Sequence, residues 1–82
     1  MSTTFIKIRN ILHKQFSFHY DQIQFETKLE LELGMDSIEM VELLNELELT
    51  FKIKINLDDI DLLIAKKRII TIKDIVNYFD AK

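Results

Sequence analysis

The chain has 82 residues, of which 48% are hydrophobic and 30% are charged. This composition predicts a folded protein rather than a disordered one, and the length leaves room for one domain over residues 1–82. The absence of cysteine excludes disulfides, cysteine metal sites and cysteine nucleophiles. No apolar run approaches the length of a membrane span or of a signal-peptide core. We therefore expect a cytoplasmic protein without a membrane span.

The formal net charge of -3 hides an uneven distribution. Seven acidic residues and no basic residue lie between positions 29 and 51, whereas the segments on either side are net basic. An acidic segment of this kind repels nucleic-acid phosphates and attracts basic protein surfaces. We expect protein partners with basic patches and no nucleic-acid partner.

Hydrophobic periodicity predicts a first helix over residues 3–16, because apolar residues recur there at three- and four-residue steps. Residues 17–35 show no sustained period and end beside Gly34, the only glycine, which predicts a long ordered loop. A loop of this length needs apolar anchors to the core. The expected anchors are Ile23, Phe25, Leu29, Leu31 and Leu33.

The strongest helical pattern runs over residues 36–51. One narrow sector of the helical wheel collects the predicted core residues Met40, Leu43, Leu44, Leu47 and Phe51. A separate sector holds Glu39, Glu42 and Glu46. Two apolar residues, Ile38 and Leu49, lie next to it. The pattern predicts an exposed acidic face that carries apolar side chains.

The last part of the chain predicts two more helices. Thr71 and Asp74 have the spacing of a capping box, and apolar residues follow at helical steps over residues 72–79. Residues 58–63 are compatible with a short helical turn. The predicted fold class is therefore an all-α bundle with three main helices and one short helix.

Two runs, residues 51–55 and 68–72, also fit short β-strands. An isolated pair of strands is only marginally stable in water. We therefore rank a loop above a two-stranded ribbon at these positions.

The chemistry centres on the run LGMDSI at residues 33–38. Asp36 and Ser37 both favour the N-cap position, but a helix has only one N-cap. With Asp36 as the cap, Glu39 completes a capping box and Ser37 becomes the first helical residue with an exposed hydroxyl. The alternative is that Ser37 is itself the N-cap and has no further role.

This run and the acidic helix after it resemble the attachment motif of acyl carrier proteins, and the order of elements along the chain is similar to theirs. The resemblance implies that a phosphopantetheinyl transferase moves 4′-phosphopantetheine from coenzyme A onto Ser37, which Asp36 helps to present. The resemblance and the acidic sector together predict a face that docks partner enzymes, made of Ile38, Glu39, Val41, Glu42, Glu46 and Glu48.

The implied function is that of a monomeric, non-catalytic carrier without metal ligands. Acyl intermediates of fatty-acid, polyketide or related biosynthesis would be held as thioesters on the arm. Two alternatives remain: an aminoacyl or peptidyl carrier, and an unmodified acidic helical adaptor for which Ser37 is only a cap.

The sequence departs from the family pattern after the motif. The family commonly has a methionine and a glutamate where this chain has Asn45 and Leu49. It often has acidic residues where this chain has Lys52 and Lys54. The segment 56–70 is longer than usual and contains three consecutive basic residues at 66–68. These departures bear on which partner enzymes the chain recognises.

Overall fold

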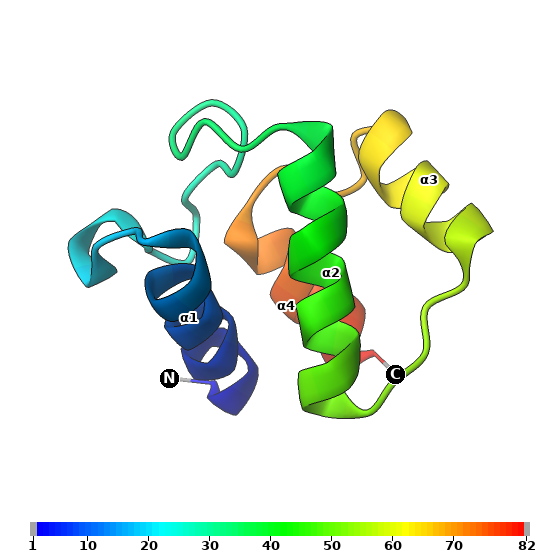
Figure 1. The fold of residues 1–82 in the computed structure, drawn as a ribbon, viewed down its shortest axis with the longest axis horizontal. Helices are drawn as coiled ribbons and strands as arrows, with labels where there is room; N and C mark the ends of the chain where they lie inside the picture. Colours follow the sequence, from blue (N-terminus) through cyan, green and yellow to red (C-terminus); the bar gives the residue numbers. More distant parts are fainter. Residues whose placement is uncertain (1, 82) are drawn as a thin grey trace.

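The computed structural model describes residues 2–81, in which four α-helices and one short 3₁₀ helix form the fold (Figure 1). The elements are α1 (Thr3–Phe16), η1 (Tyr20–Gln22), α2 (Ser37–Phe51), α3 (Leu57–Ala65) and α4 (Ile72–Asp80). The only β-pairing in the described part of the chain is an isolated antiparallel bridge between Lys28 and Thr71. The all-α prediction is confirmed, as is the ranking of loops above a two-stranded ribbon.

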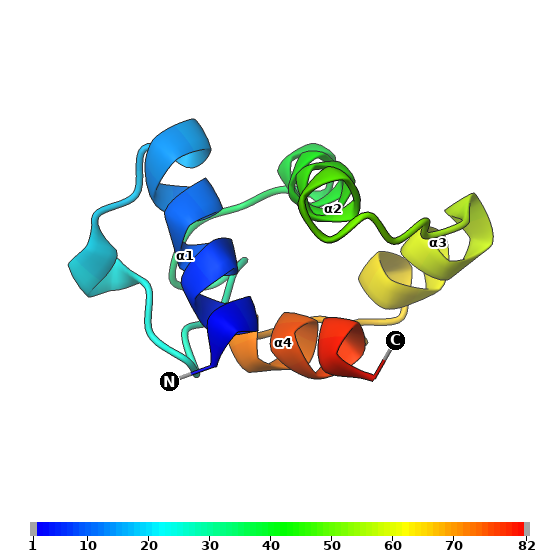
Figure 2. The same ribbon diagram turned by 90° about the horizontal axis from the view of Figure 1, so that it is seen from below.

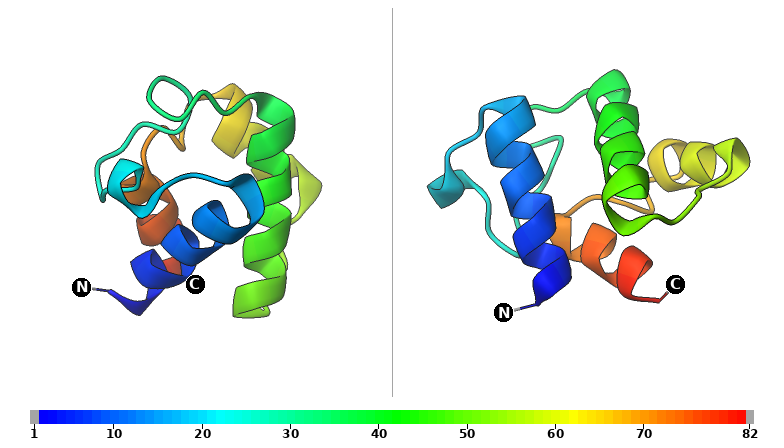
Figure 3. Two further views of the ribbon diagram at one scale, coloured as in Figure 1. Left: turned by 60° about the vertical axis from the view of Figure 1, so that its left-hand side comes forward. Right: turned by 60° about the horizontal axis from the view of Figure 1, so that its bottom comes forward.

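The helices surround one core. Helix α1 packs against both α2 and α4, and α3 packs against α2. Figures 2 and 3 show the long α1–α2 connection passing around the end of the molecule where α2 begins. The N-terminus of α2 therefore lies close to that connection and to the C-terminal end of α3 (Figure 1).

The predicted apolar stripes supply most of this core. Helix α1 has the predicted bounds, and the Ser2 hydroxyl caps it by accepting a hydrogen bond from the N–H of Phe5 (3.0 Å). Phe51, at the end of α2, is half-buried and stacks on Phe79 of α4 with ring centroids 5.2 Å apart. The fully buried side chains of the two long helices are Ile8, Leu12, Leu43, Leu44 and Leu47.

The prediction of loop anchors was correct at three of five positions. Ile23, Leu29 and Leu33 are buried, but Phe25 is 42% exposed and Leu31 is 77% exposed. The ring of Phe25 makes a T-shaped contact with the ring of Phe5, with centroids 6.0 Å apart. Leu31 lies in a tight turn whose backbone bonds direct it outward, since the N–H of Gly34 donates to the carbonyl of Glu30 (3.0 Å).

Backbone hydrogen bonds to the start of α4 hold the long loop in place. The N–H of Leu29 donates to the Ile70 carbonyl (2.9 Å), and the N–H of Ile72 donates to the Thr27 carbonyl (3.1 Å). A third bond runs from the N–H of Lys73 to the Phe25 carbonyl (2.8 Å). Hydrophobic patterning does not report such bonds, so they could not be predicted from the sequence.

Thr27 organises the turn that makes these contacts. Its side chain is buried, and its hydroxyl accepts a hydrogen bond from the N–H of Gln24 (2.8 Å) and donates one to the Gln22 carbonyl (3.1 Å). Buried polar groups need such partners to offset their lost hydration. Thr27 thereby lets a polar loop approach the core.

Helix α3 is longer than the turn predicted at residues 58–63. Asn56 caps it by accepting a hydrogen bond from the N–H of Asp59 (2.8 Å). This cap starts the helix before the acidic residues that the prediction used as its beginning. Ile60 is the anchor of α3 in the core.

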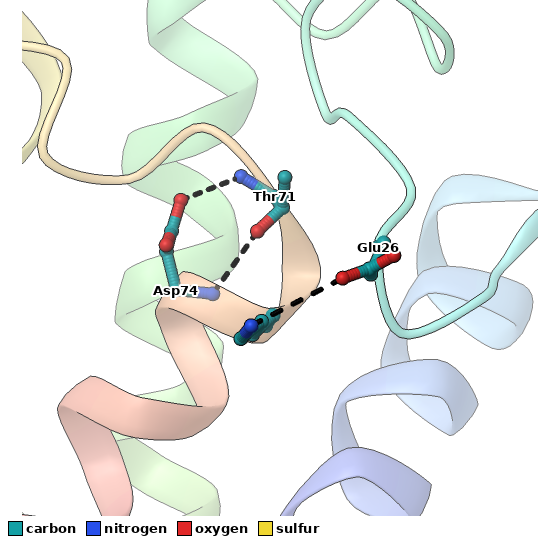
Figure 4. Close-up of polar contacts among 4 residues, drawn as sticks. Glu26, Thr71 and Asp74 are labelled. Carbon is teal, nitrogen blue, oxygen red and sulfur yellow. Dashed lines mark hydrogen bonds and ion pairs between the residues drawn. The ribbon is translucent and has the colours of Figure 1, made fainter.

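Helix α4 begins with the predicted capping box (Figure 4). The Thr71 hydroxyl accepts a hydrogen bond from the N–H of Asp74 (3.2 Å), and the Asp74 carboxylate accepts from the N–H of Thr71 (2.9 Å). Figure 4 also shows Glu26 of the long loop, which lies 4.0 Å from the ammonium group of Lys73. The cap therefore sits where the loop and α4 meet.

The surroundings of Asp74 lower its pKa. Partial burial acts to raise the pKa of this carboxyl, but hydrogen bonds from the N–H groups of Thr71 and Ile70 outweigh burial. The Thr71 hydroxyl and the Lys73 charge add smaller effects in the same direction, and the pKa lies below its ordinary value of 3.8. Asp74 thus stabilises the fold when ionised.

The stability of the fold should depend on pH through Asp74. Because its folded pKa is depressed, its contribution is present above the unfolded pKa and is lost as pH falls through the folded pKa. Urea denaturation of wild type and Asp74→Asn should show a difference in unfolding free energy that shrinks as the pH falls from about pH 5 to about pH 2. The exposed Asp21→Asn variant is the control. A difference for Asp74→Asn that stays constant over this range would contradict the expectation.

Candidate functional site

The N-terminus of α2 is closed by a reciprocal cap. The Asp36 carboxylate accepts a hydrogen bond from the N–H of Glu39 (2.8 Å), and the Glu39 carboxylate accepts one from the N–H of Asp36 (3.2 Å). Asp36 has extended backbone angles, and helical geometry begins at Ser37. The prediction that Asp36 is the cap and Ser37 the first helical residue is confirmed, and the alternative in which Ser37 caps the helix is wrong.

The cap leaves Ser37 available for chemistry. Its side chain is exposed, and its hydroxyl has no hydrogen-bond partner within residues 2–81. The first N–H groups of a helix lack intrahelical acceptors and carry the positive end of the helix dipole. A phosphate group on Ser37 would meet this positive end, together with the N–H groups of Ser37 and Ile38.

The approach to the serine is fixed by a left-handed residue between two buried ones. Gly34 has φ +68°, a region that side-chain-bearing residues rarely adopt. Leu33 and Met35 on either side are buried, so the turn is held down at both ends. Met35 and Met40 occupy the two positions of a hydrophobic staple around the cap, and both are buried. Packing of the buried residues and capping of the helix therefore act jointly to fix the position of Ser37.

A cavity of about 630 Å³ opens beside Ser37, between α2 and α3. Its size falls within the range of small-molecule sites, roughly 300–1,000 Å³. Asp36 and Ser37 lie on its lining. The walls are mostly apolar and come from α2, α3 and the α3–α4 connection: Met40, Val41, Ile64, Ala65, Ile69 and Ile70.

The sequence alone did not indicate this cavity. Met40, a predicted core residue, is both buried and part of the cavity wall. The signal that was available is the apolar run at residues 62–65, which makes α3 more apolar than a surface helix needs to be. Without the packing angle of α3 against α2, that signal could not be assigned to a cavity.

An ion pair crosses the rim of the cavity. The Lys67 ammonium group lies 2.8 Å from the Glu30 carboxylate, and both residues line the cavity. The pair connects the turn before Ser37 to the segment after α3. Both side chains are mostly exposed, and exposed pairs contribute little stability, about 0–1 kcal/mol. Lys67, from the basic run at 66–68, thus belongs to the site's border.

The predicted docking residues do not form one uniformly free acidic face. Ile38 is 70% exposed and Glu42 is exposed, with no ion pair or side-chain hydrogen bond to Glu42 within residues 2–81. Val41 is half-buried and turns toward the cavity. Ile38 and Glu42 are therefore the members of the set best placed for contact with a partner.

The other three glutamates of the set have partners inside the chain. Glu39 completes the cap. Glu46 accepts a hydrogen bond from the side-chain amide of Gln15 on α1 (3.1 Å). Glu48 accepts one from the N–H of Ile55 (2.8 Å). Sequence reasoning could not separate these roles, because they depend on neighbours from other elements.

Other kinds of site were sought in the described residues. Within residues 2–81, no group of three or more histidine or carboxylate side chains is arranged to hold a metal ion. Over the same residues, none of the helices has both the length and the apolar character needed to cross a bilayer. The N-terminus of α2 and its cavity are thus the leading candidate site.

Comparison with known proteins identifies the family of the chain. The sequence matches the family described as "Phosphopantetheine attachment site" over residues 7–79. It is 35% identical over 78 residues to an acyl carrier protein of Thermotoga maritima, covering 95% of this chain and 89% of the relative. It is 34% identical over 77 residues to an acyl carrier protein of Campylobacter jejuni subsp. doylei, covering 94% and 92%. An acyl carrier protein of Trieres chinensis is 33% identical over 79 residues, covering 96% and 91%.

The chain therefore belongs to the phosphopantetheine attachment family and, within it, groups with the acyl carrier proteins. Its cofactor is 4′-phosphopantetheine, which this family carries covalently. The chain has three serines to which a phosphodiester could be attached.

Among these serines, Ser37 fits the cofactor best. The hydroxyl of Ser2 is engaged in capping α1. Ser17 follows the C-terminal end of α1 with φ +63°, where the negative end of the helix dipole repels a phosphate. Ser37 combines an exposed hydroxyl with a helix N-terminus and an adjacent cavity.

The left-handed backbone at Gly34 should matter for stability. An added Cβ would meet no atom within 4 Å, so Gly34→Ala introduces backbone strain without a clash. We expect the variant to lose about 1 kcal/mol of unfolding free energy, measured by chemical denaturation. Gly34→Asn should lose less, because asparagine tolerates this region better. An asparagine variant as unstable as the alanine variant would argue against strain as the cause.

Proposed function

We propose that the chain is a non-catalytic carrier that holds acyl groups on 4′-phosphopantetheine attached to Ser37. The observation that carries the proposal is the exposed Ser37 hydroxyl, without a hydrogen-bond partner in residues 2–81, at the capped N-terminus of α2 beside a mostly apolar cavity. The arm supplies the thiol that this cysteine-free chain lacks. The family supports attachment as such, and the geometry supports this serine.

Each residue around the serine has a distinct role in this proposal. Ser37 Oγ forms the phosphodiester bond. The N–H groups of the first turn of α2 face the phosphate, and the helix dipole partly offsets repulsion from the Asp36 carboxylate. Asp36 orients the first turn through its bond to the N–H of Glu39 and presents the serine to the transferase.

The cavity beside Ser37 receives the apolar part of the cargo. Its aliphatic walls at Met40, Val41 and Ile69 favour a hydrocarbon chain over a charged aminoacyl group. Burial there shields the acyl group from water while it is carried. This chemistry favours the acyl carrier over the aminoacyl or peptidyl carrier.

The partners in this proposal are a phosphopantetheinyl transferase and enzymes of acyl metabolism. Ile38 and Glu42 on the outer face of α2 meet apolar and basic groups on those enzymes. Fatty-acid, polyketide or related biosynthesis remains the predicted context. A single carrier domain, a monomeric state and a cytoplasmic location also stay predictions.

Attachment can be tested by intact mass. Incubation with coenzyme A, magnesium and a broad-specificity phosphopantetheinyl transferase should add the mass of one arm to wild type. Ser37→Ala should show no addition, whereas Ser17→Ala, the matched control, should be modified like wild type. Unmodified wild-type protein after exposure to several active transferases would favour the unmodified acidic adaptor. Addition to Ser37→Ala would refute the assigned serine.

The docking role of Glu42 can be tested by charge reversal. Glu42→Lys should slow arm addition severalfold at low salt, and less at high salt, because screening weakens attraction between exposed charges. Asp21→Lys changes the net charge equally on the distant η1 helix and should behave like wild type. Equal rates for Glu42→Lys and Asp21→Lys at every salt concentration would contradict a specific role for Glu42.

A further inference from the structure

The outer face of α2 carries a second exposed apolar residue far from the serine. Ile38, Glu42, Asn45 and Leu49 follow one another at four- and three-residue steps, which places them on one helix face. Leu49 is 74% exposed. It lies twelve residues after Ser37, or about 18 Å along the helix axis. The contact around Leu49 is therefore separate from the attachment point.

A groove of about 470 Å³ surrounds Leu49 at the C-terminal end of α2. It is lined by Asn45, Glu48, Leu49, Lys52, Ile53 and Lys54. In Figure 1 this end of α2 lies opposite the end reached by the long loop. The groove thus shares no residue with the cavity beside Ser37.

Glu48 shapes this groove because its carbonyl and its carboxylate both bond to the chain that follows α2. Its carbonyl accepts hydrogen bonds from the N–H groups of Lys52 and Ile53 (the latter 3.2 Å). Its carboxylate accepts from the N–H of Ile55 (2.8 Å). One residue therefore fixes the backbone that carries both lysines, and its carboxylate is turned toward that backbone.

The lining of the groove has two basic residues and one acidic residue, a formal net charge of +1. Lys52 and Lys54 are exposed, and no ion pair to either is formed within residues 2–81. Cations near a helix C-terminus are favourable for the helix dipole, so part of their role is structural. That role does not account for an exposed leucine in the lining of the same groove.

We propose that this groove is a second docking surface, which takes a partner protein whose apolar contact residue is flanked by carboxylates. Charge complementarity selects this partner: the rim offers two ammonium groups around an apolar centre, the reverse of the acidic surface at Glu42. The proposal goes beyond the proposed carrier function and does not need the arm. A partner bound at Leu49 leaves Ser37 uncovered at the other end of α2.

Two synthetic peptides can probe the groove. One is an amphipathic helix with leucines on one face and glutamates flanking them, and the other has lysines in place of the glutamates. Titration into isotope-labelled wild type should give saturable amide shift changes at Asn45, Leu49 and Ile53 with the glutamate peptide only. Equal changes with both peptides, or none at these positions, would overturn the proposal.

Variants separate the groove from general attraction between charges. Leu49→Ser and Lys54→Glu should each weaken binding of the glutamate peptide about tenfold, the effect of removing one good contact. Lys52→Gly removes a charge while suiting the left-handed backbone (φ +55°), so its loss of binding cannot reflect misfolding. Lys66→Glu, an exposed charge reversal outside the groove, is the matched control. Wild-type affinity in Leu49→Ser, or a tenfold loss in Lys66→Glu, would refute a built docking surface.

Arm addition to the same variants distinguishes this inference from the carrier function. Variants that bind the glutamate peptide weakly should still gain one arm by intact mass. A wild type that binds the peptide at the groove but never gains an arm would overturn the carrier function alone. Normal arm addition with peptide binding unaffected by Leu49→Ser would overturn the groove alone.

Discussion

A helix has only one N-cap position, and the site depends on which residue takes that position. Asp36 takes it, and Glu39 answers from the third helical position. This division leaves the Ser37 hydroxyl exposed in the first turn. Had Ser37 been the cap, its oxygen would be occupied by the backbone and poorly placed for modification.

The cap can position Ser37 only if the loop that precedes α2 is itself held in place. Backbone bonds from the long loop to the start of α4, at Thr27 and Leu29 among others, hold the loop against the core. The buried residues Leu33 and Met35 then bring the chain to Asp36. Helix α4, which contributes no residue to the cavity beside Ser37, thus positions the serine through the loop. Mutations at the start of α4 can therefore affect a site they do not touch.

The sequence predicted the features that depend on local chemistry. Capping preferences identified Asp36 and Thr71, and helical periodicity identified the core stripes of α1, α2 and α4. It failed where a side chain's role depends on distant neighbours. Leu31 was expected inside because it is apolar, but the turn around it faces outward. Glu46 and Glu48 were grouped with Glu42 by charge, although they bond to α1 and to the chain after α2.

The helical start of α2 fixes the distance between Ser37 and every other position on the helix. Ser37 has helical geometry, so its distance from any partner contact on α2 is set by the rise of about 1.5 Å per residue. An enzyme that binds at Glu42 would find the serine about 7.5 Å further along the axis, in a fixed direction. With the arm on Ser37, as proposed, the protein would contribute a constant offset and only the arm would vary in reach. Every enzyme that binds at the same position would then have to place its own catalytic centre within one common radius of that point.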